Sequence, residues 1–415
     1  MSAWRRPPLG SLVTTIVPAR DKPVDLTGPI PWLRIEDFDG KWASESRTGQ
    51  GVTAATADAM RLRIFPTGTV ICTCSCAMGT TAIASIPLIT NQTFIGLVPR
   101  TAELSSEYLY WALQGFRDQL NSQATGAIQQ YLSRDDFRQL RIPIPPCEDQ
   151  VAIVRYLDDE TNRIDNLIAQ QSRMAALVLE RRDAVIRTAT RMGIRGEAVT
   201  ANDTPWIGEV PEGWQTLALK RVGRLAAGMA FPEDQQGNTG GPIPYLKVGD
   251  LTLPGNEEYL KNYTHTVTTA TARRLGSPIF PPNTIVFPKI GAALLSNRRR
   301  ITVLPSCTDQ NLMGLIVEQA AMRYLYYLLQ TLDFSRLRMP GPVPLLNERD
   351  AADLIIPLPP FDEQVEIAEF LDLHLGRYNQ LLALLSAVIA RMEERRRTLI
   401  TLTVTGPFDV PGLAA

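Results

Sequence analysis

The chain has 415 residues, too many for one ordinary domain and enough for several. Hydrophobic residues make up 45% of it and charged residues 20%, which excludes a largely disordered protein. The formal net charge of −1 gives no sign of a polyanionic partner until it is divided by segment. Five cysteines at irregular spacing and the lack of a signal-peptide pattern predict a cytoplasmic protein. The longest apolar run, Leu381–Ala390, is too short to cross a bilayer.

The first segment, residues 1–145, has the pattern of an α+β domain. Short β-branched runs such as Thr69–Thr73 are bounded by turn residues, and a helix-like segment follows at Glu107–Leu120. Three cysteines lie on one face of a predicted strand, at Cys72, Cys74 and Cys76. A small apolar strand face explains them better than a zinc site, because no fourth ligand is near and the aligned stretch Phe287–Gly291 has no ligand.

The sequence of residues 146–204 predicts a linker built around one long helix. The stretch IPIPPCEDQVAIVRYLD at Ile142–Asp158 places two prolines just before it and acidic residues in its first turn, as helix starts favour. Apolar residues then recur at seven-residue steps, at Leu157, Ile164, Val178 and Val185. A seven-residue step held over several heptads predicts a coiled coil.

The second half of the chain repeats the first at an offset of 210–218 residues. The stretch IPLPPFDEQVEIAEFLD at Ile356–Asp372 shares nine of its seventeen letters with Ile142–Asp158. Further matches are TNQTFIGL with TDQNLMGL and YLYWALQ with YLYYLLQ, which begin at Thr90, Thr308, Tyr108 and Tyr324. A long-period repeat of this kind predicts one duplicated unit, with a second α+β domain at 205–355 and a second linker helix and tail at 356–415.

The second linker helix carries a row of apolar residues that matches the first. Its members are Leu371, Tyr378, Leu385, Met392 and Leu399. Helices of about 40 residues are roughly 60 Å long, and two of them joined to separate domains pack most simply antiparallel. The predicted fold is therefore two globular α+β domains separated by two long helices, which form an antiparallel coiled coil with a pseudo-twofold internal repeat. The alternative is two unrelated amphipathic helices, each packed on its own domain, but the matching register favours the coiled coil.

Charge separates the two kinds of segment. Residues 1–145 carry 14 Lys and Arg against 12 Asp and Glu, and residues 210–355 carry 15 against 12. The helical segments 146–209 and 356–415 each have a net charge of −3. Basic domains and acidic helices are expected if the domains contact phosphate and the helices contact protein. The candidate DNA contacts are Arg34, Lys41, Arg47, Lys247, Lys289, Arg298, Arg299 and Arg300.

Two features of this pattern have simpler explanations than a contact with DNA. The cluster Arg298–Arg300 also fits a solvated charged loop. Gln150 and Gln364, at the start of the two predicted helices, fit a role in capping and orienting the helix better than a contact with DNA.

No catalytic constellation is visible in the sequence. The two histidines, His265 and His374, stand in unrelated contexts, which disfavours histidine-dependent hydrolysis and histidine metal sites. No phosphate-binding loop of the G-x-x-x-x-G-K-[ST] kind is present. We therefore assign no catalytic, cofactor-binding or metal-binding residue.

The chain resembles the specificity subunit of Type I restriction–modification enzymes over nearly its whole length. The resemblance depends on the two PP-x-(D/E)(D/E)-Q openings, on Trp206–Gly223 and on the closing stretch Thr398–Gly412. It implies a non-catalytic subunit whose two domains each read half of a bipartite, asymmetric DNA target. The helices would set the spacer and dock two methyltransferase (M) subunits, with endonuclease/translocase (R) subunits as further partners where present.

The resemblance also implies where the chemistry lies. This chain would hold no cofactor, whereas S-adenosylmethionine, ATP and Mg²⁺ would be bound by the partner subunits. A two-headed structural scaffold without DNA specificity is the alternative from another class. A self-sufficient methyltransferase or nuclease is disfavoured because the cofactor and catalytic motifs are missing.

Overall fold

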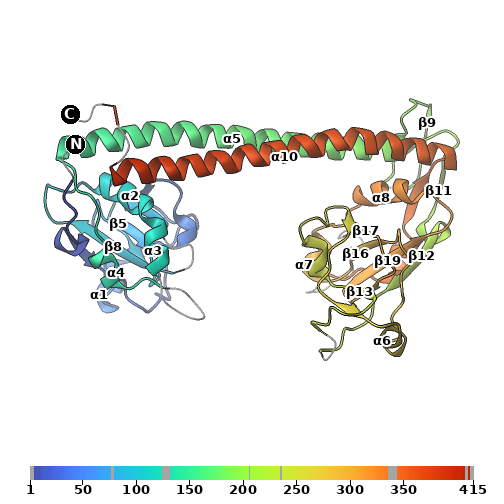
Figure 1. Cartoon of the computed structure of the whole chain (residues 1–415), viewed down its shortest axis with the longest axis horizontal. Helices are drawn as coiled ribbons and strands as arrows, with labels where there is room; N and C mark the ends of the chain where they lie inside the picture. The colour runs from blue at the N-terminus through green and yellow to red at the C-terminus, as the bar shows by residue number, and fades with distance from the viewer. Residues whose placement is uncertain are drawn as a thin grey trace. The chain divides into compact units, whose positions relative to one another are not determined.

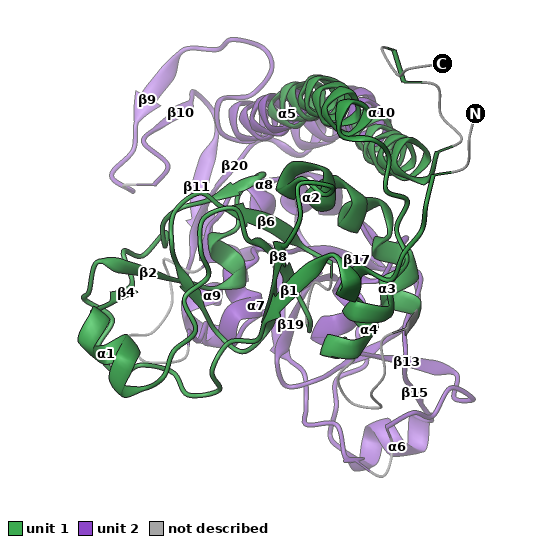
Figure 2. Cartoon of the chain, turned by 90° about the vertical axis from the view of Figure 1, so that its left-hand side faces the viewer, with its two compact units in different colours: residues 1–173, 385–415 green, residues 174–384 purple. Residues whose placement is uncertain are grey.

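The computed structural model describes residues 4–75, 79–123, 131–204, 206–233, 236–334, 344–406 and 410–411. It divides into two compact units, which Figure 2 shows in green and purple. Unit 1 comprises Met1–Arg173 and Leu385–Ala415, and unit 2 comprises Met174–Leu384. Each unit therefore contains one α+β head and a part of each of two long helices.

The head of unit 1 is built on a five-stranded sheet of order β1-β8-β5-β6-β3, in which only β3 and β6 pair in parallel. A second sheet of order β4-β2-β7 lies beside it. The strands are β1 (Val13–Ile16), β2 (Ile30–Leu33), β3 (Trp42–Ala43), β4 (Gly51–Val52), β5 (Val70–Thr73), β6 (Thr81–Ala84), β7 (Ile89–Thr90) and β8 (Phe94–Pro99). The helices are α1 (Ala54–Ala59), α2 (Ser106–Gly115), α3 (Arg117–Gln123) and α4 (Arg134–Gln139).

The head of unit 2 has the same topology. Its sheets run β12-β19-β16-β17-β14 and β15-β13-β18, with parallel and antiparallel pairs in the same places as in unit 1. The strands are β12 (Gly223–Ala227), β13 (Ile243–Leu246), β14 (Tyr259–Leu260), β15 (Thr266–Val267), β16 (Ile285–Pro288), β17 (Arg300–Thr302), β18 (Cys307–Thr308) and β19 (Leu312–Val317). The helices are α6 (Thr269–Arg274), α7 (Gly291–Leu295), α8 (Met322–Gln330) and α9 (Glu348–Ala352). The predicted duplication is thus confirmed strand by strand.

Unit 2 also contains two short strand pairs, the second of which has two isolated antiparallel bridges, Arg5 with Ile144 and Pro8 with Arg141, in its place in unit 1. The two pairs are β9 (Val199–Ala201) with β10 (Glu209–Pro211), and β11 (Gln215–Ala218) with β20 (Ile355–Leu358). The second pair joins the chain that enters the head to the chain that leaves it, just before the second long helix begins.

The two long helices are α5 (Cys147–Met192) and α10 (Phe361–Thr405). In unit 1 the beginning of α5 lies beside the end of α10, and Arg396 of α10 pairs with Asp165 of α5 at 2.9 Å (Figures 1 and 2). In unit 2 the end of α5 lies beside the beginning of α10, and both contribute to one hydrophobic core with α8. The predicted long helices therefore exist, and they pair antiparallel within each unit.

The predicted apolar rows lie on the inner faces of these helices. Fully buried members are Leu157, Ile164, Leu371 and Leu385. Half-buried members are Val178, Val185, Tyr378, Met392 and Leu399. Most helix positions between the rows are exposed, as a seam with a seven-residue period requires.

Candidate nucleic-acid interface

In unit 1 the repeated proline stretch forms the joint between the head and α5. The hydroxyl of Tyr108, on α2, donates to the carbonyl oxygen of Pro143 at 2.7 Å. The side chain of Gln150 donates to the carbonyl oxygen of Pro145 at 3.0 Å and accepts from the amide of Ser105, the N-cap of α2, at 3.0 Å. Gln150 is only 1% exposed, so its amide group replaces water for backbone groups that would otherwise be buried without partners.

Unit 2 repeats this joint with the equivalent residues. The hydroxyl of Tyr324 donates to the carbonyl oxygen of Pro357 at 3.0 Å. Gln364, which is 2% exposed, donates to the carbonyl oxygen of Pro359 and accepts from the amide of Ala321, the N-cap of α8, both at 2.8 Å. The expected role of both glutamines in orienting the helix is supported by these bonds. Each proline offers a carbonyl acceptor but no amide donor, which suits a strand that ends against a helix start.

A charged cluster fixes the first helix turns of α5 to the head of unit 1. Lys41 Nζ lies 2.7 Å from a carboxylate oxygen of Asp158 and 2.5 Å from one of Glu107. Trp111 Nε1 donates to Asp158 at 3.0 Å. The Lys41 side chain is only 14% exposed. The ammonium group is thus enclosed by two carboxylates, and its contact with DNA stays a prediction.

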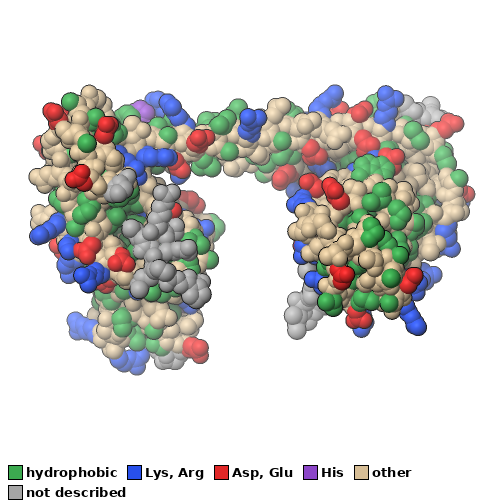
Figure 3. Space-filling model, turned by 180° about the vertical axis from the view of Figure 1, so that it is seen from behind, with side chains coloured by type: hydrophobic (Ala, Val, Ile, Leu, Met, Phe, Trp, Pro, Cys, Tyr) green, Lys and Arg blue, Asp and Glu red, His purple; other side chains and the backbone are tan. Residues whose placement is uncertain are grey.

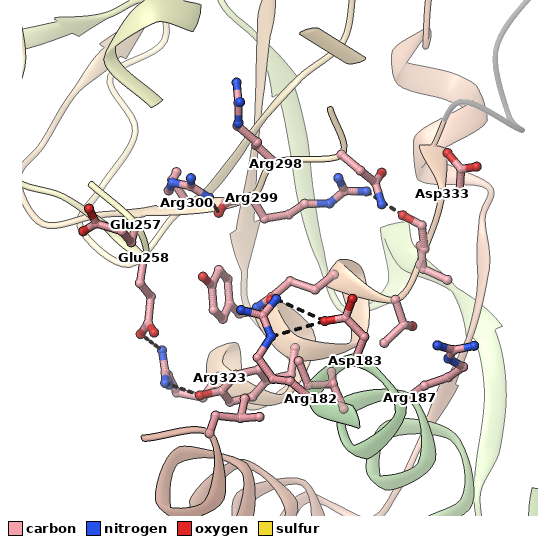
Figure 4. A pocket seen from close by; sticks show the side chains of 18 of the residues that line it. Arg182, Asp183, Arg187, Glu257, Glu258, Arg298, Arg299, Arg300, Arg323 and Asp333 are labelled. Atoms are coloured by element: carbon pink, nitrogen blue, oxygen red, sulfur yellow. Dashed lines mark hydrogen bonds and ion pairs between the residues drawn. The ribbon is translucent and has the colours of Figure 1, made fainter. Parts of the chain in front are cut away.

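Unit 2 has the same cluster around Asp372 of α10. Arg323, on α8, pairs with both Asp372 and Glu258, and the hydroxyl of Tyr327 donates to Asp372 (Figure 4). Burial lowers the pKa of Arg323, but its hydrogen bond to Asp372 and the nearby negative charges outweigh burial and leave the pKa above its ordinary value. The guanidinium therefore stays charged at any pH at which the protein folds.

The remaining candidates in unit 1 lie on the surface beside acidic neighbours. Arg34 forms an ion pair with Glu36 at 3.0 Å, and Arg47 forms one with Asp39 at 3.1 Å. Arg47 is more than half exposed. Exposed pairs such as that of Arg47 with Asp39 contribute little to stability, whereas the Arg34 side chain is half-buried.

Lys247 is the structural equivalent of Arg34 in unit 2. Each precedes a 3-10 turn, and the backbone amide of each donates to an aspartate three residues on, Asp37 or Asp250, at 2.7 Å. The Lys247 side chain is half-buried and reaches Gln236 at 3.3 Å. Lys289 is also half-buried.

The arginine cluster of unit 2 divides into three different environments. Arg298 is exposed, Arg300 is half-buried and Arg299 is 2% exposed. Arg299 donates to the carbonyl oxygen of Leu332 at 2.8 Å and its guanidinium lies 4.0 Å from the ring centre of Phe334. Burial lowers the pKa of Arg299 to about 9. The interpretation as a solvated loop is therefore wrong for Arg299, which is buried, whereas its contact with DNA stays a prediction.

The described residues hold no cluster of His, Cys, Asp and Glu that could bind a metal ion. Cys72 and Cys74 are buried, and burial raises the pKa of Cys74 to about 12, so these thiols are protonated at neutral pH. Cys76 lies outside the described residues. Among the helices that the structure describes, none is both long and apolar enough to cross a membrane.

Figure 3 shows Lys and Arg side chains interspersed with Asp and Glu on the face that it presents of each unit. The described surface therefore offers separated cations on each head and no continuous basic stripe on the face seen in Figure 3.

The segments just before β8 and β19 are turns, because Asn91 accepts from the amide of Thr93 and Asp309 accepts from that of Asn311.

Comparison with known proteins defines the class of this chain. The family model of the type I restriction modification DNA specificity domain matches it twice, over residues 19–173 and 211–389. The chain belongs to that family, and it is a specificity subunit with two DNA-recognition domains.

Two relatives come from Methanocaldococcus jannaschii. The type I restriction enzyme MjaIX specificity subunit is 26% identical over 290 residues, which cover 67% of this chain and 63% of that subunit, so the match spans less than two thirds of its length. The MjaVIII specificity subunit is 23% identical over 341 residues, which cover 78% of this chain and 75% of that subunit. A solved structure from a study of complex assembly and conformational transition of the type I R-M system has the same fold, with a TM-score of 0.73 and 16% identity over 98% of this chain and 99% of its own.

Proposed function

We propose that each head of this chain reads one half of a bipartite, asymmetric DNA target. The observation that carries this proposal is the duplicated head with an unchanged scaffold and changed surface residues. The strand order and the joint residues are the same in both units, whereas the exposed Arg298 in unit 2 aligns with the half-buried Thr80 in unit 1 through the matching strand registers. One scaffold with two different surfaces is what an asymmetric target requires, because base contacts specify sequence.

We further propose that α5 and α10 set the spacer between the half-sites and dock two methyltransferase subunits. Helices of 46 and 45 residues extend for roughly 70 Å. Their outer faces carry exposed apolar side chains at equivalent positions of the repeat. These pairs are Val151 with Val365, Leu167 with Leu381, and Met174 with Val388. Exposed apolar side chains that recur at the repeat offset suit two copies of one protein partner.

The chemistry of the complex is proposed to lie in its partners. In this account the chain is not an enzyme and binds no cofactor, while the partner subunits bring S-adenosylmethionine for methylation of adenine and, where they include an endonuclease/translocase, ATP and Mg²⁺.

Mapping of methylated adenines in cells with and without this gene tests the proposal. We expect a set of methylated sites that depends on the gene and shows two short sequence blocks at a constant gap. If no methylation depends on the gene, and the purified complex binds random duplexes with no loss of affinity at raised salt, a structural scaffold without DNA specificity becomes the better account.

A further inference from the structure

Unit 2 contains an arginine-rich cleft that none of the contacts proposed above explains. Its volume is about 1300 Å³, and its walls come from α5, α8, α10 and the chain around the start of β17 (Figure 4). The arginines that line it are Arg182, Arg187, Arg191, Arg298, Arg299, Arg300 and Arg323. Figure 4 shows Arg298–Arg300 on one side and Arg182 and Arg187, from α5, on the other.

Several of these guanidinium groups are buried with incomplete hydrogen bonding. Arg299 is 2% exposed, and its Nε makes no hydrogen bond within the described part of the chain. The same holds for the buried Nε atoms of Arg191 and Arg300. Buried donors nearly always have a hydrogen-bond partner in folded proteins. Three unpaired donors around one cleft therefore indicate that the cleft binds a ligand with hydrogen-bond acceptor atoms.

The positive charge in the cleft is only partly compensated. Seven arginines line the cleft with five carboxylates, those of Asp183, Glu257, Glu258, Asp333 and Asp372. Asp183 pairs with Arg182 at 3.1 Å, and Glu258 and Asp372 both pair with Arg323. The backbone carbonyl of Arg187 accepts from Thr190, but its side chain and that of Arg298 make no ion pair or hydrogen bond among the described residues. Burial and the charge of Arg187 lower the pKa of Arg191, and burial is the main cause of a lowered pKa at Arg300, to which Arg298 adds. A bound anion would relieve both repulsions.

The arginines around the start of β17, and Arg187 of α5, have no arginine at the equivalent positions of the other half. In the strand registers, Ile301 of β17 corresponds to Ile83 of β6, so Arg298, Arg299 and Arg300 stand where unit 1 has Thr80, Thr81 and Ala82. The equivalent of Arg187 at the repeat offset is Thr401. A partner that docks once on each half would use surfaces that both halves share. The ligand of this cleft therefore makes a contact with the second half that it does not repeat on the first.

We propose that this cleft binds phosphate groups of the DNA backbone beside the half-site read by the second head. The proposal rests on the proposed function, because it assumes that this head meets DNA. Guanidinium groups match the geometry of phosphate oxygens and offer two donors at a time. Arg187 and Arg298 stand exposed at the edge of the cleft and meet the phosphates first, while Arg299 supplies a fixed donor and charge from inside. An acidic segment of a partner that docks once on each half would need the same arginines in both halves, whereas two different half-sites need not share their phosphate contacts.

The salt dependence of DNA binding tests this assignment. The double variant Arg187→Gln/Arg298→Gln leaves the buried Arg299 in place, so the fold is retained, which its thermal unfolding verifies. Binding of the native complex to a target duplex and to an unrelated duplex is measured from low to moderate salt. We expect the slope of log K against log salt to fall by about 0.9 for each phosphate that the variant no longer neutralises. The ratio of the two affinities should stay the same, because phosphate contacts carry no sequence information.

A matched control removes two arginines elsewhere on the same unit. Arg224, on β12, and Arg349, on α9, are exposed, and β12 is the edge strand opposite β14, separated from β17 by two strands. The double variant Arg224→Gln/Arg349→Gln should leave the slope unchanged, and an equal fall in both double variants would overturn the assignment.

Three other results would also overturn the assignment of the cleft to DNA phosphate, and each has a different consequence for the proposed function. DNA binding with an unchanged slope in the cleft variant removes this inference and leaves the proposed function standing. No salt-dependent DNA binding by the unaltered complex removes both. Binding of poly-glutamate that the cleft variant alone loses, with its DNA binding intact, assigns the cleft to an acidic protein segment instead.

Discussion

Lys41 and Glu258 occupy the same place in the two units and carry opposite charges. The carbonyl oxygen of each accepts from an equivalent isoleucine amide, Ile83 at 2.8 Å and Ile301 at 2.9 Å. Their partners are reversed as well, since Glu107 on α2 corresponds to Arg323 on α8. The ion pair has thus exchanged its two charges between a strand edge and a helix, while the cation still reaches the aspartate of the long helix in both units.

Charge reversal at Lys41 should be rescued by a second reversal. Lys41→Glu places a third carboxylate beside those of Glu107 and Asp158. We expect the free energy of unfolding to fall by about 2 kcal/mol, because the side chain at position 41 is only partly exposed. Adding Glu107→Arg recreates the arrangement of unit 2 and should restore most of the loss. Thermal unfolding of the single and double variants measures both steps, and a double variant less stable than the single one would refute the equivalence.

The buried glutamine of each joint should be needed for stability. Gln150→Ala leaves the carbonyl oxygens of Pro145 and Glu103 and the amide of Ser105 without their partner. We expect a loss of about 2–4 kcal/mol, because buried groups left unpaired carry the full cost of desolvation. Gln170→Ala, at an exposed position of the same helix, should change stability by less than about 0.5 kcal/mol. Denaturant unfolding compares the two variants, and equal losses would show that the joint contributes nothing specific.

Gly115 should tolerate no side chain, because the end of α10 packs against it. A Cβ atom there would lie 2.3 Å from Cγ2 of Val404. Valine has little rotamer freedom in a helix, so we expect Gly115→Ala to cost about 1–3 kcal/mol. Val404→Ala, added to it, should make the double variant more stable than the sum of the two single losses predicts. Strict additivity in a double-mutant cycle would mean that these residues do not touch.

Glu363 should make stability depend on pH in the opposite sense to a paired carboxylate. It accepts from Trp214 Nε1 at 3.1 Å, is 3% exposed, and has a raised pKa, mainly because of burial and then because of Glu197. A raised pKa in the fold favours the protonated form, so the carboxylate destabilises the fold near neutral pH and this penalty disappears as pH falls below the ordinary pKa.

Replacement of Glu363 by glutamine removes that titration. Glu363→Gln should therefore be more stable than the unaltered chain at pH 7, with a difference that shrinks toward pH 4. Denaturant unfolding at several pH values gives this difference directly. The control Glu369→Gln changes an exposed carboxylate on the same helix and should show little pH-dependent difference, and a difference for Glu363→Gln that grows at low pH would contradict the account.

The sequence predicted the features that repeat along the chain. The two proline stretches, the heptad rows and the matched strands all leave a periodic or duplicated signal, and Leu157 and Leu371 are buried as that signal requires. The joint glutamines were interpreted correctly because they stand at a helix start in both copies.

The contacts between distant residues left no such signal. Lys41 is 117 positions from Asp158. Its equivalent in the second half, Glu258, carries the opposite charge, so an alignment of the two halves gives no sign that both residues belong to the same ion-pair cluster. The burial of Arg299 could have been suspected, since alternate residues on the approach to a strand face opposite sides, so adjacent arginines cannot all be solvated in the same way. The arginine cleft could not be predicted from the sequence, because residues of α5, α8, α10 and β17 that are far apart in the chain line it together.

The measurement that tests the central proposal most directly is a map of methylated sites after both long helices are shortened. Deletion of one heptad from each of α5 and α10 keeps the seam in register and removes about 10 Å, or about three base pairs of DNA. We predict that the gap between the two sequence blocks shortens by about three base pairs while both blocks keep their letters. An unchanged gap, or new letters in either block, would contradict the proposal that paired helices set the spacing of two separate DNA readers.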